Sequence, residues 1–521
     1  MFNRRRIDLK FKISENKQIL INIFSSIIAF TISILINFLL SPYIVKNLGE
    51  EANGFVQLAN NFIMYASLIT IALNSMAGRF ISISYHKGDL KSANEYYSSL
   101  ILGNIAIIII LLLPSIFLIC KLDNFLNISY KNIIDVKILF SFIFLSFFIT
   151  QISGIFNIST YVTNELYLNN IVNVLRSILN GFLLIIFFSL LMPKIYFVSL
   201  VGFILSIFTL LASYLIKIKV LDKIKFNIKN FNFKSILEMI SSGIWNTINQ
   251  CGNILMTGLD LLLANIFIDP IQMGLLSVAK IVPNSIIQLA GIVNSNFSPA
   301  LTISYSKGMT SGLLKQLRAS MKISSVLISI PIVVFCVLGE YFYQLWMPTL
   351  NSKVLISLSI LTCMAFIPFA GPQVLYNVYT TTNKLRVNSL SVVVGGVFNF
   401  ILVYLLIKYS NLGIYAIAGV SSMISIIRNL IITVPYTAIL LNLRWYEFYK
   451  DVFISLICCL ICYFITVVTK LLVMPSNWLW LIIDIIISSI ISFIIIILFV
   501  LNKDEKKILK NKLLKGVKKN G

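Results

Sequence analysis

Fourteen long apolar runs constrain the fold of this 521-residue chain more than any other feature. A helix needs about 20 mostly apolar residues to cross the hydrocarbon core of a bilayer, and each run is long enough to do so. The runs are continuous and do not alternate with period two, which excludes a transmembrane β-barrel. The sequence therefore predicts an all-α polytopic membrane protein. The expected spans are residues 19–41, 54–78, 98–120, 138–160, 171–191, 195–216, 237–263, 274–297, 320–339, 353–378, 388–408, 412–440, 452–473 and 478–500.

The composition fits a membrane protein, and the distribution of basic residues predicts its orientation in the membrane. Only 12% of the residues are charged, against about 25% in a soluble domain, and the formal net charge is +23. Thirty-one of the 42 Lys and Arg residues fall on one side of the span map and eight on the other. By the positive-inside rule, both termini are expected in the cytoplasm, next to anionic membrane lipids. Nucleic acid is not expected as a partner.

The sequence offers few of the residues that metal binding, redox chemistry or nucleotide hydrolysis would require. His86 is the single histidine, which leaves no His-based metal site or catalytic triad. Cys458, Cys459 and Cys462 have CxxC spacing but lie in an apolar run, so we interpret them as packing residues. No GxxxxGK[ST] motif occurs. We expect no cofactor, and energy from a H⁺ or Na⁺ gradient or from the membrane potential.

Two stretches of the chain match each other at an offset of 220 residues. Residues 53–88 and 273–308 share nine identities, and both contain an Asn-Ser pair and end in Ile-Ser-Tyr-x-Lys-Gly. Six spans separate the copies, so the two halves should have the same orientation in the membrane, as in parallel-repeat transporters. The expected organisation is a basic tail (1–18), a six-helix bundle (19–216), a basic linker (217–236), a second six-helix bundle (237–440), two extra helices (452–500) and a basic tail (501–521).

Polar residues recur at helical spacing along the repeat-related spans 1, 2, 7 and 8. Because a polar side chain facing lipid is costly, such a stripe marks a face turned toward protein or water. Two interpretations stay open, namely interhelical hydrogen bonding and a solvated central cavity. The candidate cavity residues are Asn246, Asn249, Gln250 and Asn253 on span 7, Asn284 and Gln288 on span 8, and Gln57, Asn60 and Asn61 on span 2. Span 1 adds Asn22, Ser26, Ser33 and Asn37.

Asp260 and Lys280 stand at equal depth on two consecutive spans. Both lie roughly 10 Å below the turn at Asp269 and Pro270, given a rise of 1.5 Å per residue. A lone charge at that depth is costly, so the two are expected to pair. Either the pair is structural, or Lys280 meets an anionic substrate while Asp260 holds it or exchanges a proton. Pro283, close to Lys280, frees a backbone carbonyl and permits a kink.

Three arginines are further candidates for binding an anionic head group. Arg79 closes span 2, while Arg176 and Arg428 lie within spans 5 and 12. A guanidinium binds phosphate in bidentate fashion, but a long basic side chain can also reach from a helix to the interface. Both interpretations stay open for each residue.

Several segments resemble one branch of a transporter superfamily. They are LGEEANGFVQLAN, AGRFISISYHKGD, SGIWNTINQCGNILMTGLDLLLANIF with MGLLSVAKIVP, and FYQLWMPT. Together with fourteen spans in two halves, they are similar to the polysaccharide transporter branch of the multidrug/oligosaccharidyl-lipid/polysaccharide exporter superfamily. The resemblance implies a flippase for undecaprenyl-pyrophosphate-linked oligosaccharide repeat units in the bacterial cytoplasmic membrane. It also implies alternating access around a central cavity lined by spans 1, 2, 7 and 8, with a polysaccharide polymerase and glycosyltransferases as partners.

Two other classes of protein remain as alternatives to this one. An ion-coupled multidrug or cation exporter of the related MATE type would need a membrane-embedded carboxylate, which Asp260 could supply, but would be expected to stop at twelve spans. A glycan polymerase or ligase would need a sizeable external loop with catalytic charges, and the longest external segment here is the short 121–137 stretch. A transporter is therefore expected and an enzyme is not.

The orientation can be tested with a reporter enzyme fused after Lys234, in the basic linker. We expect the activity of a cytoplasmic reporter, because the linker lies on the basic side of the span map. A fusion after Lys194, on the other side, is the matched control and should report an external position. An external signal from the first fusion would overturn the span count.

Overall fold

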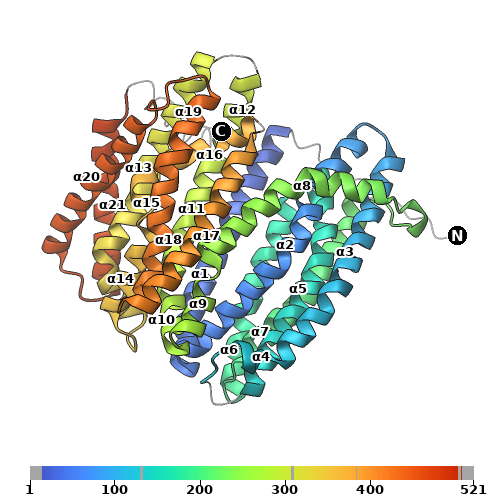
Figure 1. Ribbon diagram of the computed structural model, residues 1–521, viewed down its shortest axis with the longest axis horizontal. Coiled ribbons are helices and arrows are strands. Elements are labelled where there is room, and N and C mark those ends of the chain that lie inside the picture. The colour runs from blue at the N-terminus through green and yellow to red at the C-terminus, as the bar shows by residue number, and fades with distance from the viewer. Residues whose placement is uncertain (1–14, 130–132, 307–309, 383, 503–505, 507–521) are drawn as a thin grey trace. The chain divides into compact units, whose positions relative to one another are not determined.

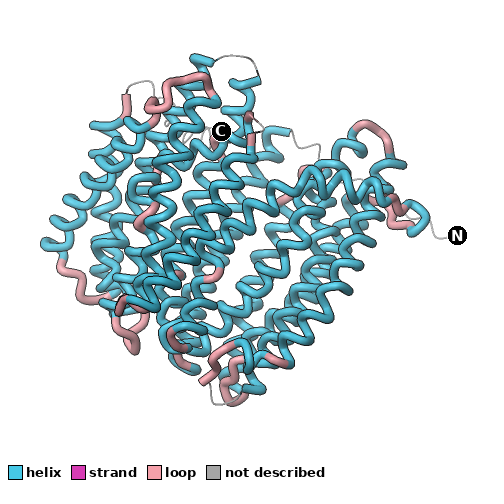
Figure 2. Tube along the Cα trace, viewed as in Figure 1, coloured by secondary structure: helices cyan, strands magenta, loops and turns pink. Residues whose placement is uncertain are grey.

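The computed structural model describes residues 15–129, 133–306, 310–382, 384–502 and 506. Within these ranges the chain forms helices joined by loops, with no strand (Figure 2). The all-α prediction is confirmed. The long elements, labelled in Figure 1, are α1 (Glu15–Leu48), α2 (Glu50–His86), α3 (Leu90–Cys120), α5 (Ile133–Val162), α6 (Tyr167–Leu190), α7 (Tyr196–Val220), α8 (Phe233–Asn253), α13 (Thr310–Trp346), α17 (Leu385–Tyr409), α18 (Ile414–Arg428), α20 (Tyr449–Val473) and α21 (Trp478–Val500).

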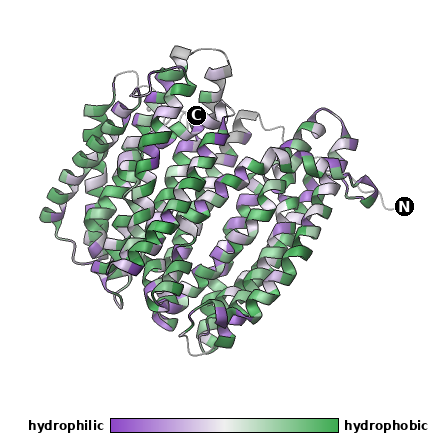
Figure 3. Ribbon diagram, in the orientation of Figure 1, coloured by the Kyte–Doolittle hydropathy of each residue, from purple (hydrophilic) through white to green (hydrophobic). Residues whose placement is uncertain are grey.

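Shorter elements complete the chain. They include α4 (Leu122–Phe125), the π turn η2 (Ile254–Gly258), α9 (Asp260–Phe267), α10 (Pro270–Ala279), α11 (Ile281–Ser295), α12 (Ser298–Ser306), α14 (Ser352–Cys363), α15 (Phe366–Phe369), η3 (Pro372–Leu375), α16 (Tyr376–Thr381), the π turn η4 (Asn429–Thr433) and α19 (Val434–Leu440). Apolar residues predominate along the helices (Figure 3).

Among the described residues, twelve segments are long and apolar enough to cross a membrane. They correspond to twelve of the fourteen predicted spans, and the chain is a multi-pass membrane protein. Of the two remaining segments, 237–263 consists of α8, the π turn η2 and the short helix α9, and 353–378 is divided into short helices. The Asn and Gln side chains of α8 lower the hydropathy of the first, and Pro368 and Pro372 remove backbone donors from the second. The count of fourteen is therefore an approximate description.

Contacts divide the chain into two compact units. The first contains residues 1–40, 69–117 and 138–243, and the second contains 41–68, 118–137 and 244–521. In the first unit, buried Leu73, Tyr97, Leu100 and Ile155 belong to one apolar cluster. The predicted six-helix domains, with boundaries at residues 216 and 237, remain a prediction.

The core of the second unit lies where α13 packs against α20 and α21 (Figure 1). Buried aliphatic and aromatic side chains fill this core, and Cys458, Cys459 and Cys462 lie among them as free thiols. The two extra helices predicted at 452–500, which are α20 and α21, thus pack closely against the second unit through apolar side chains. In the described part of the chain, no three His, Cys, Asp or Glu side chains gather in a way that could hold a metal ion.

The repeat-related helices α2 and α10 touch at equivalent glycines. A Cβ built on Gly54 would lie 3.0 Å from the Cα of Gly274, its partner at the 220-residue offset. Beside this contact, Asn53 Nδ2 donates to Ser277 Oγ over 2.8 Å. Small residues allow two backbones to approach closely within a membrane. Equivalent positions facing each other are what a two-fold relation between the two copies produces, and this supports the internal repeat.

This close approach makes a prediction about Gly274→Ala. A Cβ at Gly274 would overlap the backbone of Glu50, so α2 and α10 must separate, at a cost of about 1–3 kcal/mol. We expect a lower midpoint of thermal unfolding for the purified protein. Gly291→Ala on α11 is the matched control, because its Cβ meets no atom within 4 Å. Equal midpoints for the two variants would contradict the contact.

Candidate substrate-binding site

The π turn η2 brings three helices of the second unit to one point. Side chains from other elements donate hydrogen bonds to the backbone carbonyl oxygens of this turn. Asn399 Nδ2 on α17 donates to the oxygens of Leu255 and Met256 over 3.2 and 2.9 Å. Asn61 Nδ2 and Tyr65 Oη on α2 both donate to Gly258 O, over 3.2 and 2.7 Å. The remaining carbonyl, that of Thr257, accepts from Lys280 Nζ at 3.4 Å.

Asp260 and Lys280 form a buried ion pair next to this turn. Lys280 Nζ donates to Asp260 Oδ2, and both residues are buried. The pairing expected from their equal depth is therefore present. With its ammonium shared between Asp260 and the Thr257 carbonyl, Lys280 is not accessible to a substrate in this conformation. The structural interpretation of the pair accounts for its geometry.

The helix carrying Lys280 breaks at this residue, between α10 and α11. Pro283 has no N–H to give to the Ala279 carbonyl four residues before it. Instead, Ser359 Oγ and Tyr343 Oη donate to Ala279 O over 2.8 and 3.3 Å. The freed carbonyl that the sequence predicted is therefore satisfied within the second unit, as a backbone group inside a membrane must be.

The polar residues predicted for spans 7 and 8 are only partly covered. On α8, Asn246, Asn249 and Gln250 are half-buried and Asn253 is exposed, while Asn284 and Gln288 on α11 are exposed. None of the six side chains has a hydrogen bond to another described residue. The interpretation that these stripes serve interhelical hydrogen bonding does not apply to these six residues. It applies to Asn61 of span 2 and to Asn22 and Ser26 of span 1, which bond to other segments.

The predicted residues of span 2 behave differently from one another. Asn60 is exposed and its amide donates to Val56 O of its own helix over 2.9 Å, and Gln57 is half-buried. Arg79 is exposed near the end of α2. It lies in the first unit, whereas the six polar residues named on α8 and α11 lie in the second.

Arg428 lies at the end of α18, where the π turn η4 begins. Its Nη2 donates to Tyr376 Oη over 2.7 Å and to Asn429 Oδ1 over 3.0 Å, and the guanidinium lies over the Tyr376 ring. Its Nε and Nη1 are buried without a hydrogen-bond partner. No carboxylate among the described residues is within ion-pair distance, so the cation is held by neutral groups only.

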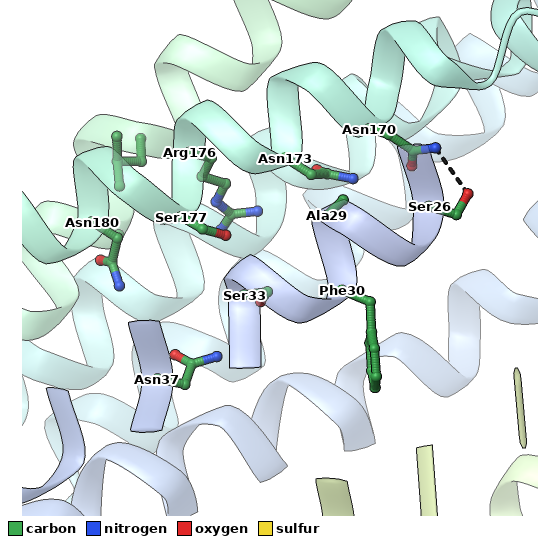
Figure 4. A pocket seen from close by; sticks show the side chains of 12 residues that line it. Ser26, Ala29, Phe30, Ser33, Asn37, Asn170, Asn173, Arg176, Ser177 and Asn180 are labelled. Atoms are coloured by element: carbon green, nitrogen blue, oxygen red, sulfur yellow. Dashed lines mark hydrogen bonds between the residues drawn. The ribbon is translucent and has the colours of Figure 1, made fainter. Parts of the chain in front are cut away.

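Arg176 lines a polar cavity inside the first unit (Figure 4). The cavity has a volume of about 460 Å³ and walls from α1, α6 and α7. Three residues of the predicted span 1 stripe, Ser26, Ser33 and Asn37, face it from α1. Sequence reasoning found Arg176 but missed the residues beside it on α6. Their steps of 3, 4 and 3 were the available signal, and they are Asn170, Asn173, Ser177 and Asn180.

Comparison with known proteins gives consistent matches. A protein-family model described as "Polysaccharide biosynthesis protein" matches residues 19–288. "Uncharacterized membrane protein EpsK" of Bacillus subtilis (strain 168) is 27% identical over 437 residues, covering 83% of this chain and 85% of that protein. The structure titled "Lipid II flippase MurJ, inward closed conformation" has a TM-score of 0.64 at 16% identity, covering 95% of this chain and 99% of that one. An inward-facing MATE family multidrug resistance transporter has a TM-score of 0.63 at 14% identity, covering 80% and 94%.

The fold of this multi-pass membrane protein is similar to the folds of these two solved structures. The chain belongs to the polysaccharide biosynthesis protein family. The predicted resemblance is confirmed. The family and the structural relatives also support a transporter rather than an enzyme.

The ion pair makes a prediction for neutralising variants. Asp260→Asn leaves the buried Lys280 without an anion, and losing one partner of a buried pair costs about 3–5 kcal/mol. We expect less folded protein in the membrane and a lower unfolding midpoint for either single variant, Asp260→Asn or Lys280→Gln. The double variant should recover much of the loss, because two amides can hydrogen-bond to each other.

The amount of monodisperse protein after solubilisation, with its thermal midpoint, measures this effect. Lys353→Gln, at an exposed position, is the control and should match the wild type. A double variant no better than the sum of the two singles would show that the pair does not act as a unit.

Proposed function

We propose that the protein is a flippase that moves lipid-linked oligosaccharide repeat units across the bacterial cytoplasmic membrane for surface polysaccharide synthesis. The cargo would be linked to undecaprenyl pyrophosphate and moved by alternating access, with both chain termini in the cytoplasm. The family match and the likeness to transporter folds support this proposal. A polysaccharide polymerase and glycosyltransferases would act before and after it.

The observation that carries the proposal is the charge left over within the helices. The one carboxylate among the predicted site residues, Asp260, is neutralised by Lys280. Arg176 and Arg428 have no carboxylate partner in the part of the chain that the structure describes. Among the predicted site residues the residual charge is therefore positive, which suits a pyrophosphate-linked cargo and opposes an organic cation.

An ion-coupled multidrug or cation exporter is the alternative. It would require an embedded carboxylate free to exchange a proton or bind Na⁺, and Asp260 is engaged in this conformation. Asp484 on α21 is another buried carboxylate within the described helices, and both of its oxygens are buried without a hydrogen-bond partner. We expect no loss of function in Asp484→Asn if the flippase proposal holds. The driving force would be a H⁺ or Na⁺ gradient or the membrane potential.

The test is the pool of lipid-linked oligosaccharides in cells that lack the protein. Mass spectrometry gives the identity of the accumulated species, and an impermeant glycan-modifying reagent reports the leaflet. We expect a completed repeat unit on its lipid carrier that the reagent cannot reach in intact cells. Expression of the wild-type chain should restore the normal pool. An unchanged pool and leaflet distribution in the deletion would overturn the proposal.

A further inference from the structure

The cavity in the first unit is a partly open pocket with its own polar lining, and the Asp260–Lys280 pair belongs to the second unit. Its volume of about 460 Å³ falls in the range of roughly 300–1,000 Å³ that small-molecule sites occupy. The lining residues on α6 run from Asn170 to Asn180, about 15 Å along the helix axis at 1.5 Å per residue. The cavity can therefore hold a ligand larger than a simple ion.

The lining is unusually rich in groups that both donate and accept hydrogen bonds. One face of α6 carries Asn170, Asn173, Ser177 and Asn180 toward the cavity, and α1 presents Ser26, Ser33 and Asn37 from the other side (Figure 4). A carboxamide donates from its nitrogen and accepts at its oxygen, and a hydroxyl does both. Sugar hydroxyls have the same dual character, so they can be bound from either side.

Most of this hydrogen-bonding capacity is unused. Asn170 is fixed by α1, since its Nδ2 donates to Ser25 Oγ and Ser26 Oγ over 2.8 and 2.9 Å (Figure 4). The other polar side chains in the lining have no hydrogen bond to any described residue. They are Ser33, Asn37, Asn173, Ser177 and Asn180. One end of the cavity is thus held in place by the protein, and the rest presents free donors and acceptors.

Arg176 gives the cavity its charge. It lies about 14 Å along α6 from Tyr167, at the depth of the hydrocarbon core. No lining residue is acidic, and no described carboxylate is within ion-pair distance of the guanidinium. An unpaired cation at this depth is costly, and an oxyanion bound in the cavity would remove that cost. The planar guanidinium binds a carboxylate or a phosphate in bidentate fashion.

We propose that this cavity binds a sugar that carries one oxyanion, either a carboxylate or a phosphate group. Arg176 binds the oxyanion, and the amides and hydroxyls of α1 and α6 bind the ring hydroxyls. The inference rests on the proposed function in that the sugar would belong to the cargo or to its junction with the lipid carrier. Binding itself can be measured without transport, which makes the two proposals separable.

The first experiment is calorimetric titration of the purified full-length protein in lipid nanodiscs. Glucuronate, glucose 6-phosphate and glucose are the three probes. We expect at least tenfold tighter binding of one of the two charged sugars than of glucose. Preference for glucuronate assigns the oxyanion to an acidic sugar of the cargo, and preference for glucose 6-phosphate assigns it to a sugar phosphate. Arg176→Gln should reduce affinity for the charged sugar at least tenfold and leave that for glucose unchanged.

A pair of glycines offers a matched test of the location. Gly202 lines the cavity, and a Cβ built on it meets no protein atom within 4 Å. Gly202→Val should therefore fill part of the cavity without disturbing the fold, and abolish binding. Gly154 on α5 has the same free space but lies outside the lining, so Gly154→Val should bind like the wild type.

Three outcomes would overturn the proposal: equal affinity for glucose and both charged sugars, unchanged binding in Gly202→Val, or no heat of binding with any of the three probes. None of these results would affect the flippase proposal, which is decided by the lipid-linked pool in deletion cells. Conversely, selective binding together with an unchanged lipid-linked pool would keep the cavity as a sugar site and remove the flippase.

Discussion

The second unit is organised around backbone groups that cannot be left unpaired inside a membrane. Where α8 ends in a π turn, the backbone departs from the regular α-helical pattern at residues 254–258, and polar backbone groups inside a membrane require partners. Asn399, Lys280, Asn61 and Tyr65 donate hydrogen bonds to carbonyl oxygens of this turn. Because these side chains come from three other segments, satisfying one irregular turn fixes α2, α17 and the α10–α11 break around it.

This arrangement separates residues that look alike in a sequence. Lys280, Arg176 and Arg428 are all cations within apolar spans, yet only Lys280 has a carboxylate partner among the described residues. Lys280 is paired with Asp260, and Arg428 donates hydrogen bonds to Tyr376 and Asn429. Arg176 faces an open polar cavity. A positive charge becomes available to a ligand only where the surrounding helices leave it unpaired.

Much of the fold could be predicted from the sequence, because apolar run length is set directly by the bilayer. The Asp260–Lys280 pair followed from depth along two neighbouring helices, and the freed carbonyl at Ala279 followed from Pro283. The partners of that carbonyl, Ser359 and Tyr343, could not be predicted, since they depend on how distant helices pack. The lining of the cavity around Arg176 could be predicted only in part. The sequence pattern indicated the polar residues of α1, but on α6 it indicated Arg176 alone.

The two copies of the internal repeat differ in whether their helices are continuous or interrupted. Residues 34–38 and 60, which correspond to η2 and Lys280 at the 220-residue offset, lie within the uninterrupted helices α1 and α2. Their counterparts are a π turn and a helix break. A continuous helix resists bending along its whole length, whereas a break concentrates the bending at one point. The helices of the first copy are therefore stiffer than those of the second. A force that acts equally on both copies would bend the second copy more, at η2 and at the break next to Lys280.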